Sequence, residues 1–378
     1  MTEQSPSSLP SAERLRGILD RAGGLTVGIE EELMVLDAGT LDLAPRAHEL
    51  LEALDGDSRF KPELPAAQIE LVTAPARTVG DAVAQLADGR RRLTEAGEDS
   101  LLLAAAGAHP FADEEGELNM AKRYRRTREE YGWAARRQLV FGLHVHVRVS
   151  GADRALAVYN AMRSYLPELA ALAANAPFHA GRDTGLASIR PKISEMLPRQ
   201  GVPPSLGSVE ELAGALRWGA QARAFPEARL WWWELRLHPL HGTLEVRVPD
   251  QQTTVRETAA VAALTHALTA WLAASYDEGE RLPCHPTWRI EENRWSACRH
   301  GLEGTLADLD TGEPRPARER LCSLLDALEP TGALLGCGAE LASAHELTEA
   351  TGAERQRAAG LEGGAAGIAS WLASRFNA

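Results

Sequence analysis

Two histidines lie two positions apart in an otherwise apolar stretch, "QLVFGLHVHVRVS" (138–150). We expect this stretch to form a β-strand, in which successive side chains point to opposite faces. His144 and His146 would then share one face, with Val145 and Val147 on the other. Imidazole is a common metal ligand and, when protonated, pairs with anions. The alternative is two hydrogen-bonded histidines of an ordinary sheet.

Three further predicted strands contain carboxylates. In "LTVGIEEELMVLD", Glu30 and Glu32 share one face and Glu31 takes the other. Glu70 lies within "QIELV", and Glu245 lies within "TLEVRV". Glutamate is disfavoured inside a strand, and like charges on one face repel each other. We therefore expect positive groups to face these carboxylates, unless each one simply faces water on a one-sided sheet.

Two arginines, Arg236 and Arg247, fall in two adjoining predicted strands and complete a mixed-charge set on the sheet surface. Carboxylates with a single imidazole suit Mg²⁺ or Mn²⁺ better than zinc, which favours more histidine or cysteine. Divalent ions beside arginines are what phosphoryl transfer needs, because both neutralise charge on phosphate oxygens. The chain has no G-x-x-x-x-G-K-[ST] and no G-x-G-x-x-G motif. An ATP site would therefore be built on the sheet rather than on a phosphate-binding loop.

The elements that must position these residues are short strands scattered between helices. Several strands are hairpin-like, as in 230–239 followed by 242–250. This order predicts an α+β fold with an antiparallel sheet backed by helices. No boundary divides the chain cleanly, so we expect a flexible N-terminal segment over 1–24 and a single domain over 25–378.

Three other segments have distinctive compositions. Residues 177–206 are rich in Gly, Pro and Arg and predict a long functional loop. The charged and aromatic segment 111–137 is either a solvated helix or a mobile element that closes over a substrate. The uncharged stretch 258–276 approaches the length of a membrane span, but its Ala, Thr and His266 indicate a buried core helix.

The overall composition is that of a soluble globular protein, with 44% hydrophobic and 25% charged residues in 378. The net charge of −13 argues against broad attraction to nucleic acid or to an anionic membrane. The four cysteines lack C-x-x-C spacing, and the first residues contain no apolar signal-peptide region. We therefore expect reduced thiols and a cytoplasmic protein. The oligomeric state is left open, a homo-oligomer included.

Several of these stretches together resemble the glutamate–cysteine ligase type 2 family of bacterial carboxylate–amine ligases. The likeness runs in order from about residue 25 to about residue 375, and "GLHVH" and "EVRVPD" also look like strands of glutamine synthetase. The blocks that carry it are "VGIEEELMVLD", "QLVFGLHVHV", "NAPFHAGRDTGLASIRP", "GTLEVRVPD", "ENRWSACRHGLEG" and "GAERQRAAG".

The resemblance implies a curved, mainly antiparallel sheet that forms a funnel with helices packed outside. It implies that ATP activates a carboxylate, usually the γ-carboxylate of glutamate, as an acyl phosphate that an amine then attacks. The implied Mg²⁺ (or Mn²⁺) ligands are Glu30, Glu32, Glu70, His144 and Glu245. His146, Arg236 and Arg247 would bind the ATP phosphates, with both arginines catalytic, and Arg182, Asp183, Thr184, Ser188 and Arg190 would bind the amino-acid substrate.

The chain departs from the family pattern at a few positions. Ala176 and His179 replace residues that usually read closer to A-N-S-P-F-W, so an acceptor other than cysteine is expected if they line the amine pocket. Trp231, Trp232 and Trp233 form a longer tryptophan run than the family shows, and we expect them to pack rather than to hold adenine. Arg294 also matches the family, but it could simply pair with a neighbouring glutamate of its own helix.

The ligand set alone permits two other interpretations. In a sheet-based divalent-metal hydrolase, water attacks a metal-polarised centre. In a non-catalytic Mg-ATP-binding module, the same ligands bind nucleotide without turnover. No G-x-S-x-G elbow and no Cys–His signature occurs, so a covalent enzyme nucleophile is not expected. Phosphate release that requires both a carboxylate and an amine would distinguish the ligase.

Overall fold

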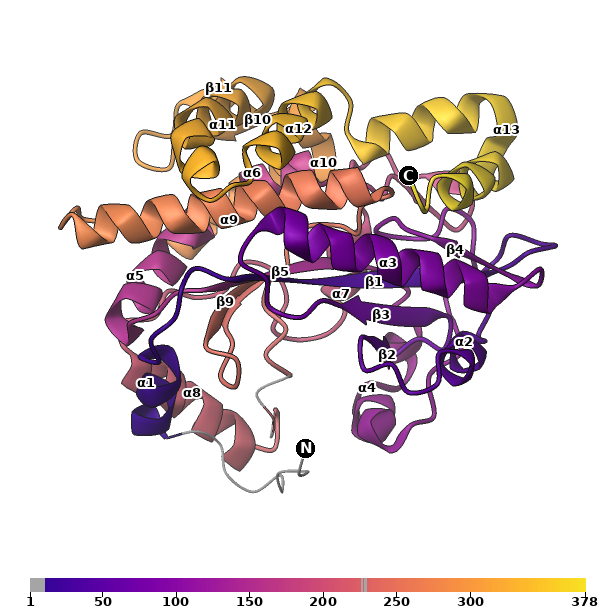
Figure 1. Cartoon of the computed structure of the whole chain (residues 1–378), viewed down its shortest axis with the longest axis horizontal. Coiled ribbons are helices and arrows are strands. Elements are labelled where there is room, and N and C mark those ends of the chain that lie inside the picture. The colour runs from indigo at the N-terminus through magenta and orange to yellow at the C-terminus, as the bar shows by residue number, and fades with distance from the viewer. Residues whose placement is uncertain (1–10, 226, 228–229) are drawn as a thin grey trace.

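The computed structural model describes residues 11–225, 227 and 230–378 (Figure 1). Its strands are β1 (Val27–Asp37), β2 (Phe60–Pro62), β3 (Gln68–Val72), β4 (Leu101–Ala104), β5 (Leu143–Arg148), β6 (Phe178–His179), β7 (Arg182–Asp183), β8 (Leu235–Leu237), β9 (Thr243–Val246), β10 (Thr305–Ala307) and β11 (Pro314–Pro316). Its α-helices are α1 (Ala12–Leu19), α2 (Ala47–Ala53), α3 (Val79–Gly97), α4 (Arg125–Arg136), α5 (Ala152–Met162), α6 (Leu166–Leu172), α7 (Arg190–Ser194), α8 (Val209–Gln221), α9 (Val255–Asp277), α10 (Thr287–His300), α11 (Ala317–Leu334), α12 (Gly338–Glu349) and α13 (Gly352–Ser374), and η1 (Lys122–Tyr124) is a short 3₁₀-helix before α4.

The main sheet is antiparallel throughout its described pairings. Its strands follow the order β2-β3-β1-β5-β9-β8, and β4 pairs with the far end of β1. The sheet is open at β2 and β8, so it does not close into a barrel. The predicted α+β architecture, an antiparallel sheet with helices outside it, is confirmed, and β8 and β9 form the expected hairpin.

One face of the sheet is covered by long helices. Figure 1 shows α3 and α9 lying across it, and α11 and α12 pack on the outer side of α9. The valines and leucines of β1 and β5 that point to this face are fully buried. Among the described helices, α9 is long and apolar enough to cross a membrane, but 89% of its most apolar window is buried in protein. The prediction of a core helix is confirmed.

The other face of the sheet is covered only in part. At the end of β1 near β4, Met34 and Leu36 pack against Ile368 and Leu372 of α13. The middle of β1 and the adjoining part of β5 have no such apolar cover among the described residues, and their polar side chains line a cavity together with residues of α4 and α7. Figure 1 shows α4 on this side of the sheet, away from α3 and α9. The predicted polar residues are therefore positioned on the half of this face that remains open.

The N-terminal part of the chain differs from the expected flexible segment. Residues 1–10 lie outside the described residues, but α1 contacts α5 and α8 through the buried Leu15 and Leu19. Arg16 Nε also lies 2.8 Å from Glu210 Oε1 of α8. Since apolar burial and an ion pair hold Ala12–Leu19 in place, this part belongs to the folded body. A single domain over 25–378 stays a prediction.

Candidate active site

Strand register brings the predicted residues together on one sheet face. Glu30 of β1 lies opposite His144 of β5, and Glu32 lies opposite Glu70 of β3. His146 lies opposite Glu245 of β9, and Glu245 lies opposite Arg236 of β8. Because directly opposed residues point to the same face, these side chains form one continuous polar surface across five strands.

A candidate cation site lies at the centre of this surface. Glu30, His146 and Glu245 each offer one ligand atom, and these atoms lie within 4.8 Å of one another. His146 Nε2 is 3.3 Å from Glu30 Oε1 and 3.9 Å from Glu245 Oε1, yet among the described residues this buried nitrogen makes no hydrogen bond. Two carboxylates and an unsatisfied buried imidazole nitrogen are a donor set that fits a divalent cation.

The two histidines have opposite electrostatic environments. Burial alone would lower the pKa of His146, but the charges of Glu245 and Glu30 outweigh it and raise that pKa. Burial, with help from Arg247, lowers the pKa of His144. Glu30 lies between both rings, and although burial opposes its ionisation, its contacts with the histidines hold its pKa well below the usual value. Glu30 is therefore ionised, as a metal ligand must be.

A second cluster of carboxyl groups, Glu32, Glu63 and Glu70, lies beside the candidate cation site. Burial raises the pKa of Glu70 to about 8 and that of Glu63 to about 7. The charge of Glu32 adds to both shifts, and that of Glu30 adds to the shift of Glu70. Lys61 Nζ is 3.2 Å from Glu70 Oε2 and Arg123 Nη2 is 3.6 Å from Glu63 Oε1, but both carboxyl pKa values remain raised despite these two ion pairs. A cation bound here would relieve the repulsion. Sequence reasoning missed Glu63, although its position between the two prolines of "PELP", just after β2, was a usable signal.

The two predicted arginines both contact Glu245. Arg236 donates from Nη2 to Glu245 Oε1 at 2.9 Å and also from Nε, and Arg247 donates from Nη1 to Oε1 at 2.5 Å. Burial would raise the pKa of Glu245, but Arg236, His146 and Arg247 together hold it well below the usual value. The positive groups expected to face Glu245 are therefore present. They also fix the orientation of this fully buried carboxylate.

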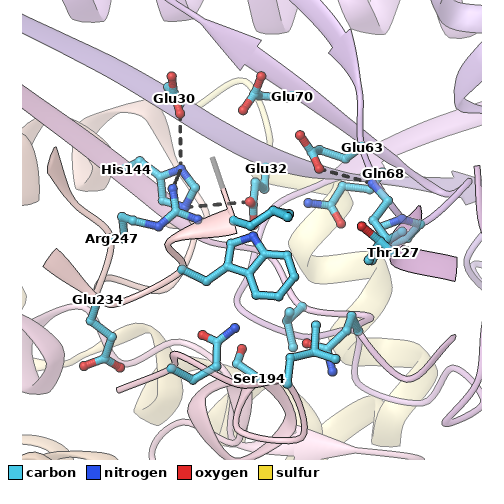
Figure 2. Close-up of a pocket in the computed structure, with 18 of the residues that line it drawn as sticks. Glu30, Glu32, Glu63, Gln68, Glu70, Thr127, His144, Ser194, Glu234 and Arg247 are labelled. Carbon is cyan, nitrogen blue, oxygen red and sulfur yellow. Dashed lines mark hydrogen bonds and ion pairs between the residues drawn. The ribbon is translucent and has the colours of Figure 1, made fainter. Parts of the chain in front are cut away.

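Seven of these residues line a cavity of about 370 Å³ (Figure 2), namely Glu30, Glu32, Glu63, Glu70, His144, Arg236 and Arg247. His146 and Glu245 lie behind them and are not among its lining residues. Figure 2 shows Glu30, Glu32 and His144 on the sheet side, with Glu234 and Ser194 across the space from them. The opposite wall comes from η1, α4, α7 and the segment around Trp232. Within the tryptophan run, Trp231 is buried against Phe225, whereas Trp232 reaches the cavity. Movement of the 111–137 segment over the cavity, one of the two alternatives for this segment, stays a prediction.

The structure does not bring all five predicted substrate residues to this cavity. Arg190 lines it, and its guanidinium also bonds to Asp250 Oδ1 at 2.8 Å and to main-chain carbonyls that precede Asp250. Arg182, Asp183, Thr184 and Ser188 are not among the lining residues. Asp183 pairs with Arg357, Thr184 bonds to the carbonyl of Pro177, and Ser188 bonds to Asp250. Ala176 and His179 do not line the cavity either.

One lining residue depends on a partner far away in the sequence. Arg294 of α10 makes a two-point ion pair with Glu234, with Nη2 at 2.7 Å from Oε1 and Nε at 2.9 Å from Oε2. The expected partners within α10 are therefore wrong. Both side chains are buried, and Glu234 lines the cavity. Arg294 thus fixes an acidic group on the wall opposite the sheet.

Comparison with known proteins identifies what this arrangement is similar to. The family model described as glutamate-cysteine ligase family 2 matches residues 26–361. A Rubrobacter xylanophilus protein named "Putative glutamate--cysteine ligase 2-3" is 40% identical over 92% of this chain and 96% of its own length. A Thermobifida fusca protein named "Putative glutamate--cysteine ligase 2" is 36% identical over 90% of this chain and 87% of its own length.

Two solved structures have a similar fold at low sequence identity. The glutamate–cysteine ligase of Francisella tularensis, solved in complex with AMP, has a TM-score of 0.71 at 12% identity and covers 95% of this chain and 89% of its own. A bifunctional glutathione synthetase from Pasteurella multocida has a TM-score of 0.62 at 17% identity and covers 97% of this chain and 53% of its own. These two likenesses concern the fold.

Proposed function

Since this chain belongs to glutamate–cysteine ligase family 2, an ATP-dependent ligase family, we propose that it joins a small-molecule carboxylate to an amine. The proposed carboxylate is the γ-carboxylate of glutamate, and cysteine is one candidate amine. In the proposed reaction, the γ-phosphoryl group of ATP transfers to a carboxylate oxygen, and ADP leaves. The amine nitrogen then attacks the acyl carbon, inorganic phosphate departs, and the nitrogen loses a proton to leave an amide.

The observation that carries this proposal is the convergence of Glu30, His146 and Glu245 on one open sheet face, within 4.8 Å of each other, with two arginines on Glu245. Mg²⁺ or Mn²⁺ held by these groups would neutralise the triphosphate and polarise its terminal phosphorus centre. Glu32, Glu63 and Glu70 would hold a further cation, and His144 would support Glu30 from 3.2 Å. This assignment moves His146 from the phosphates to the metal.

The chain's own residues supply orientation and charge. Arg247 lines the cavity and bonds Glu245 through Nη1, so the rest of its guanidinium can face phosphate oxygens and the reacting carboxylate. Arg236 also lines the cavity and adds positive charge there, while its Nη1 donates to the carbonyl of Trp231 at 3.2 Å. Arg190 is the one predicted substrate residue that we retain, because it lines the cavity while Asp250 holds it. No enzyme nucleophile is needed, since the phosphoryl group transfers directly to the substrate.

The test is ADP formation by the purified protein with Mg²⁺ and ATP, screened against amino acids in pairs. A ligase releases ADP only when a carboxylate and an amine are both present, and an amide accumulates in equal amount. Phosphate release from a substrate without ATP would support a metal hydrolase, and nucleotide binding without turnover would support a binding module. Glu30→Gln should lower turnover by about 100-fold or more, whereas Glu329→Gln, on the exposed side of α11, should not.

Cellular location and assembly accompany this proposal as expectations. The four cysteines are free, which agrees with reduced thiols. A cytoplasmic location, where ATP is available, and a homo-oligomeric state stay predictions. Size-exclusion chromatography with light scattering would determine the oligomeric state.

A further inference from the structure

The turn that joins β8 to β9 carries two histidines to which the proposed reaction assigns no role. His238 and His241 both line the cavity, and their rings are stacked with centroids 4.1 Å apart and planes 23° from parallel. The rings lie 5.8 Å and 6.1 Å from the ring of His146. A stacked imidazole pair thus adjoins the candidate cation site.

The turn is held in place on both sides. The N–H of His238 donates to the carbonyl of Thr243 at 2.8 Å, and the N–H of Gly242 donates to the carbonyl of His238 at 2.9 Å. Gly242 has a φ of +66°, and a Cβ there would lie 2.9 Å from the carbonyl oxygen of Ile18 in α1. Because only glycine fits this approach, α1 and the hairpin fix the pair in one position.

The hydrogen bonds of His238 define its protonation state. Its Nδ1 accepts from the main-chain N–H groups of Leu240 at 3.3 Å and of His241 at 3.1 Å. A protonated imidazole donates from both nitrogens and cannot accept, so His238 is neutral. One face of the His241 ring is covered by this neutral ring, yet His241 remains exposed. The pair therefore presents a flat aromatic surface in which the ring of His238 is uncharged.

We propose that the stacked pair of His238 and His241 is the nucleobase subsite of the ATP site, with the base stacking on the open surface of His241. This rests on the proposed function, which places the triphosphate at Glu30, His146 and Glu245. A neutral aromatic surface favours a base over a phosphate, since stacking needs a π face and phosphate binding needs charge. The ring of His241 lies 6.1 Å from that of His146, so the proposed base subsite adjoins the proposed phosphate site.

The competing platform is Trp232, which also lines the cavity. Its ring already contacts Tyr131 edge-on at 5.6 Å, and the guanidinium of Arg199 lies 5.4 Å from its centre. These partners occupy much of the indole, whereas His241 is exposed and has one ring stacked on it, that of His238. We therefore assign the base to the histidine pair.

The experiment compares two ligands that share phosphates but differ in the base. Calorimetry would measure the affinity of the full-length protein for Mg·ATP and for Mg·tripolyphosphate, in wild type, His241→Ala, His241→Phe and Trp232→Ala. We expect His241→Ala to weaken the binding of Mg·ATP by about tenfold and to leave the affinity for Mg·tripolyphosphate unchanged. His241→Phe should restore ATP affinity. The turn should persist in both variants, because position 241 contributes its main-chain N–H to His238.

The remaining outcomes separate failure of the subsite from failure of the function. Equal weakening of ATP and tripolyphosphate in His241→Ala would mean that the histidine binds phosphate, and no weakening would remove it from the site; either overturns the subsite. A selective loss of ATP affinity in Trp232→Ala alone would move the base to the indole. If the wild-type protein binds neither ligand, the proposed function fails as well.

Discussion

Glu31 and Arg90 form a fully buried ion pair on the sheet face opposite Glu30 and Glu32. Arg90 Nη2 lies 2.6 Å from Glu31 Oε1, and Arg90 Nε lies 2.8 Å from Oε2. The same guanidinium donates to the carbonyls of Gln252, Thr253 and Phe376. The middle glutamate of the "EEE" run is thus a structural residue that ties β1 to α3, to the start of α9 and to the end of the chain.

Arg90→Met should destabilise the protein strongly, because it leaves Glu31 buried without its charge partner. Removing one member of a buried pair costs about 3–5 kcal/mol. Urea unfolding followed by circular dichroism measures the change in the free energy of unfolding. Arg91→Met is the matched control: Arg91 pairs with Asp88 and Glu95 on the exposed side of the same helix, where such pairs contribute about 1 kcal/mol or less. Equal effects of the two substitutions would contradict the structural role of the pair.

Thr243→Val should weaken divalent-cation binding by about 10- to 100-fold, the usual effect of removing a partner that orients a metal ligand. Thr243 Oγ1 lies 2.9 Å from His146 Nδ1, which turns Nε2 toward Glu30 and Glu245. Thr243→Ser keeps the hydroxyl and should restore the affinity. Electron paramagnetic resonance of added Mn²⁺ measures the cation affinity of each variant and does not depend on turnover. A valine variant with wild-type affinity would show that the hydroxyl is not needed to orient the ring.

Metal-free protein should lose stability as the pH rises from about 4.5 to about 8. Burial and neighbouring carboxylates raise the pKa of Glu63 to about 7 and that of Glu70 to about 8, from an ordinary value of 4.5. Both groups stay protonated in the folded chain but ionise on unfolding, so unfolding releases protons and becomes easier as the pH rises. Thermal unfolding in EDTA across this range measures the effect.

Mg²⁺ should counteract that loss, because it binds the ionised carboxylates. The increase in Tm on adding Mg²⁺ should therefore be larger near pH 8 than near pH 6. Glu70→Gln removes one titrating group and should flatten the pH dependence in EDTA. A Tm that rises with pH between about 5 and 8 in EDTA would contradict the raised pKa values.

Glu245→Gln should destabilise the fold as well as the site. Arg236 and Arg247 both bond this carboxylate, and the substitution would remove the negative charge that faces two largely buried guanidinium groups, at a cost of about 3 kcal/mol or more. Glu30→Gln should cost less, since its contacts are with imidazoles that can release their protons. Denaturant unfolding of both variants in EDTA measures the two losses of unfolding free energy. A larger loss in Glu30→Gln than in Glu245→Gln would contradict this prediction.

Strand periodicity accounts for the part of the site that the sequence predicted. Alternation places Glu30 with Glu32 and His144 with His146 whatever the register, because it is a property of each strand alone. Which strand pairs with which is decided by packing across the whole chain. Only the structure shows that His146, and not His144, lies between Glu30 and Glu245.

Residues outside the strands were predicted least well. Glu63 lies in a loop after β2, and the partner of Arg294 is Glu234, sixty positions away. Neither has a periodic pattern, so only tertiary packing identifies them. The conspicuous polar residues of 182–188 hold their own loop in place: Thr184 bonds to the carbonyl of Pro177, and Asp183 pairs with Arg357 of α13. Residue type alone does not distinguish such a structural role from substrate binding.

Mn²⁺ titration of the purified protein, monitored by electron paramagnetic resonance, tests whether Glu30, His146 and Glu245 together bind a divalent cation. We expect saturable binding that Mg²⁺ displaces. Glu30→Gln should weaken this binding by about tenfold or more, and Glu329→Gln should leave it unchanged. Wild-type protein without saturable Mn²⁺ binding, or equal binding in Glu30→Gln, would contradict the proposed cation site.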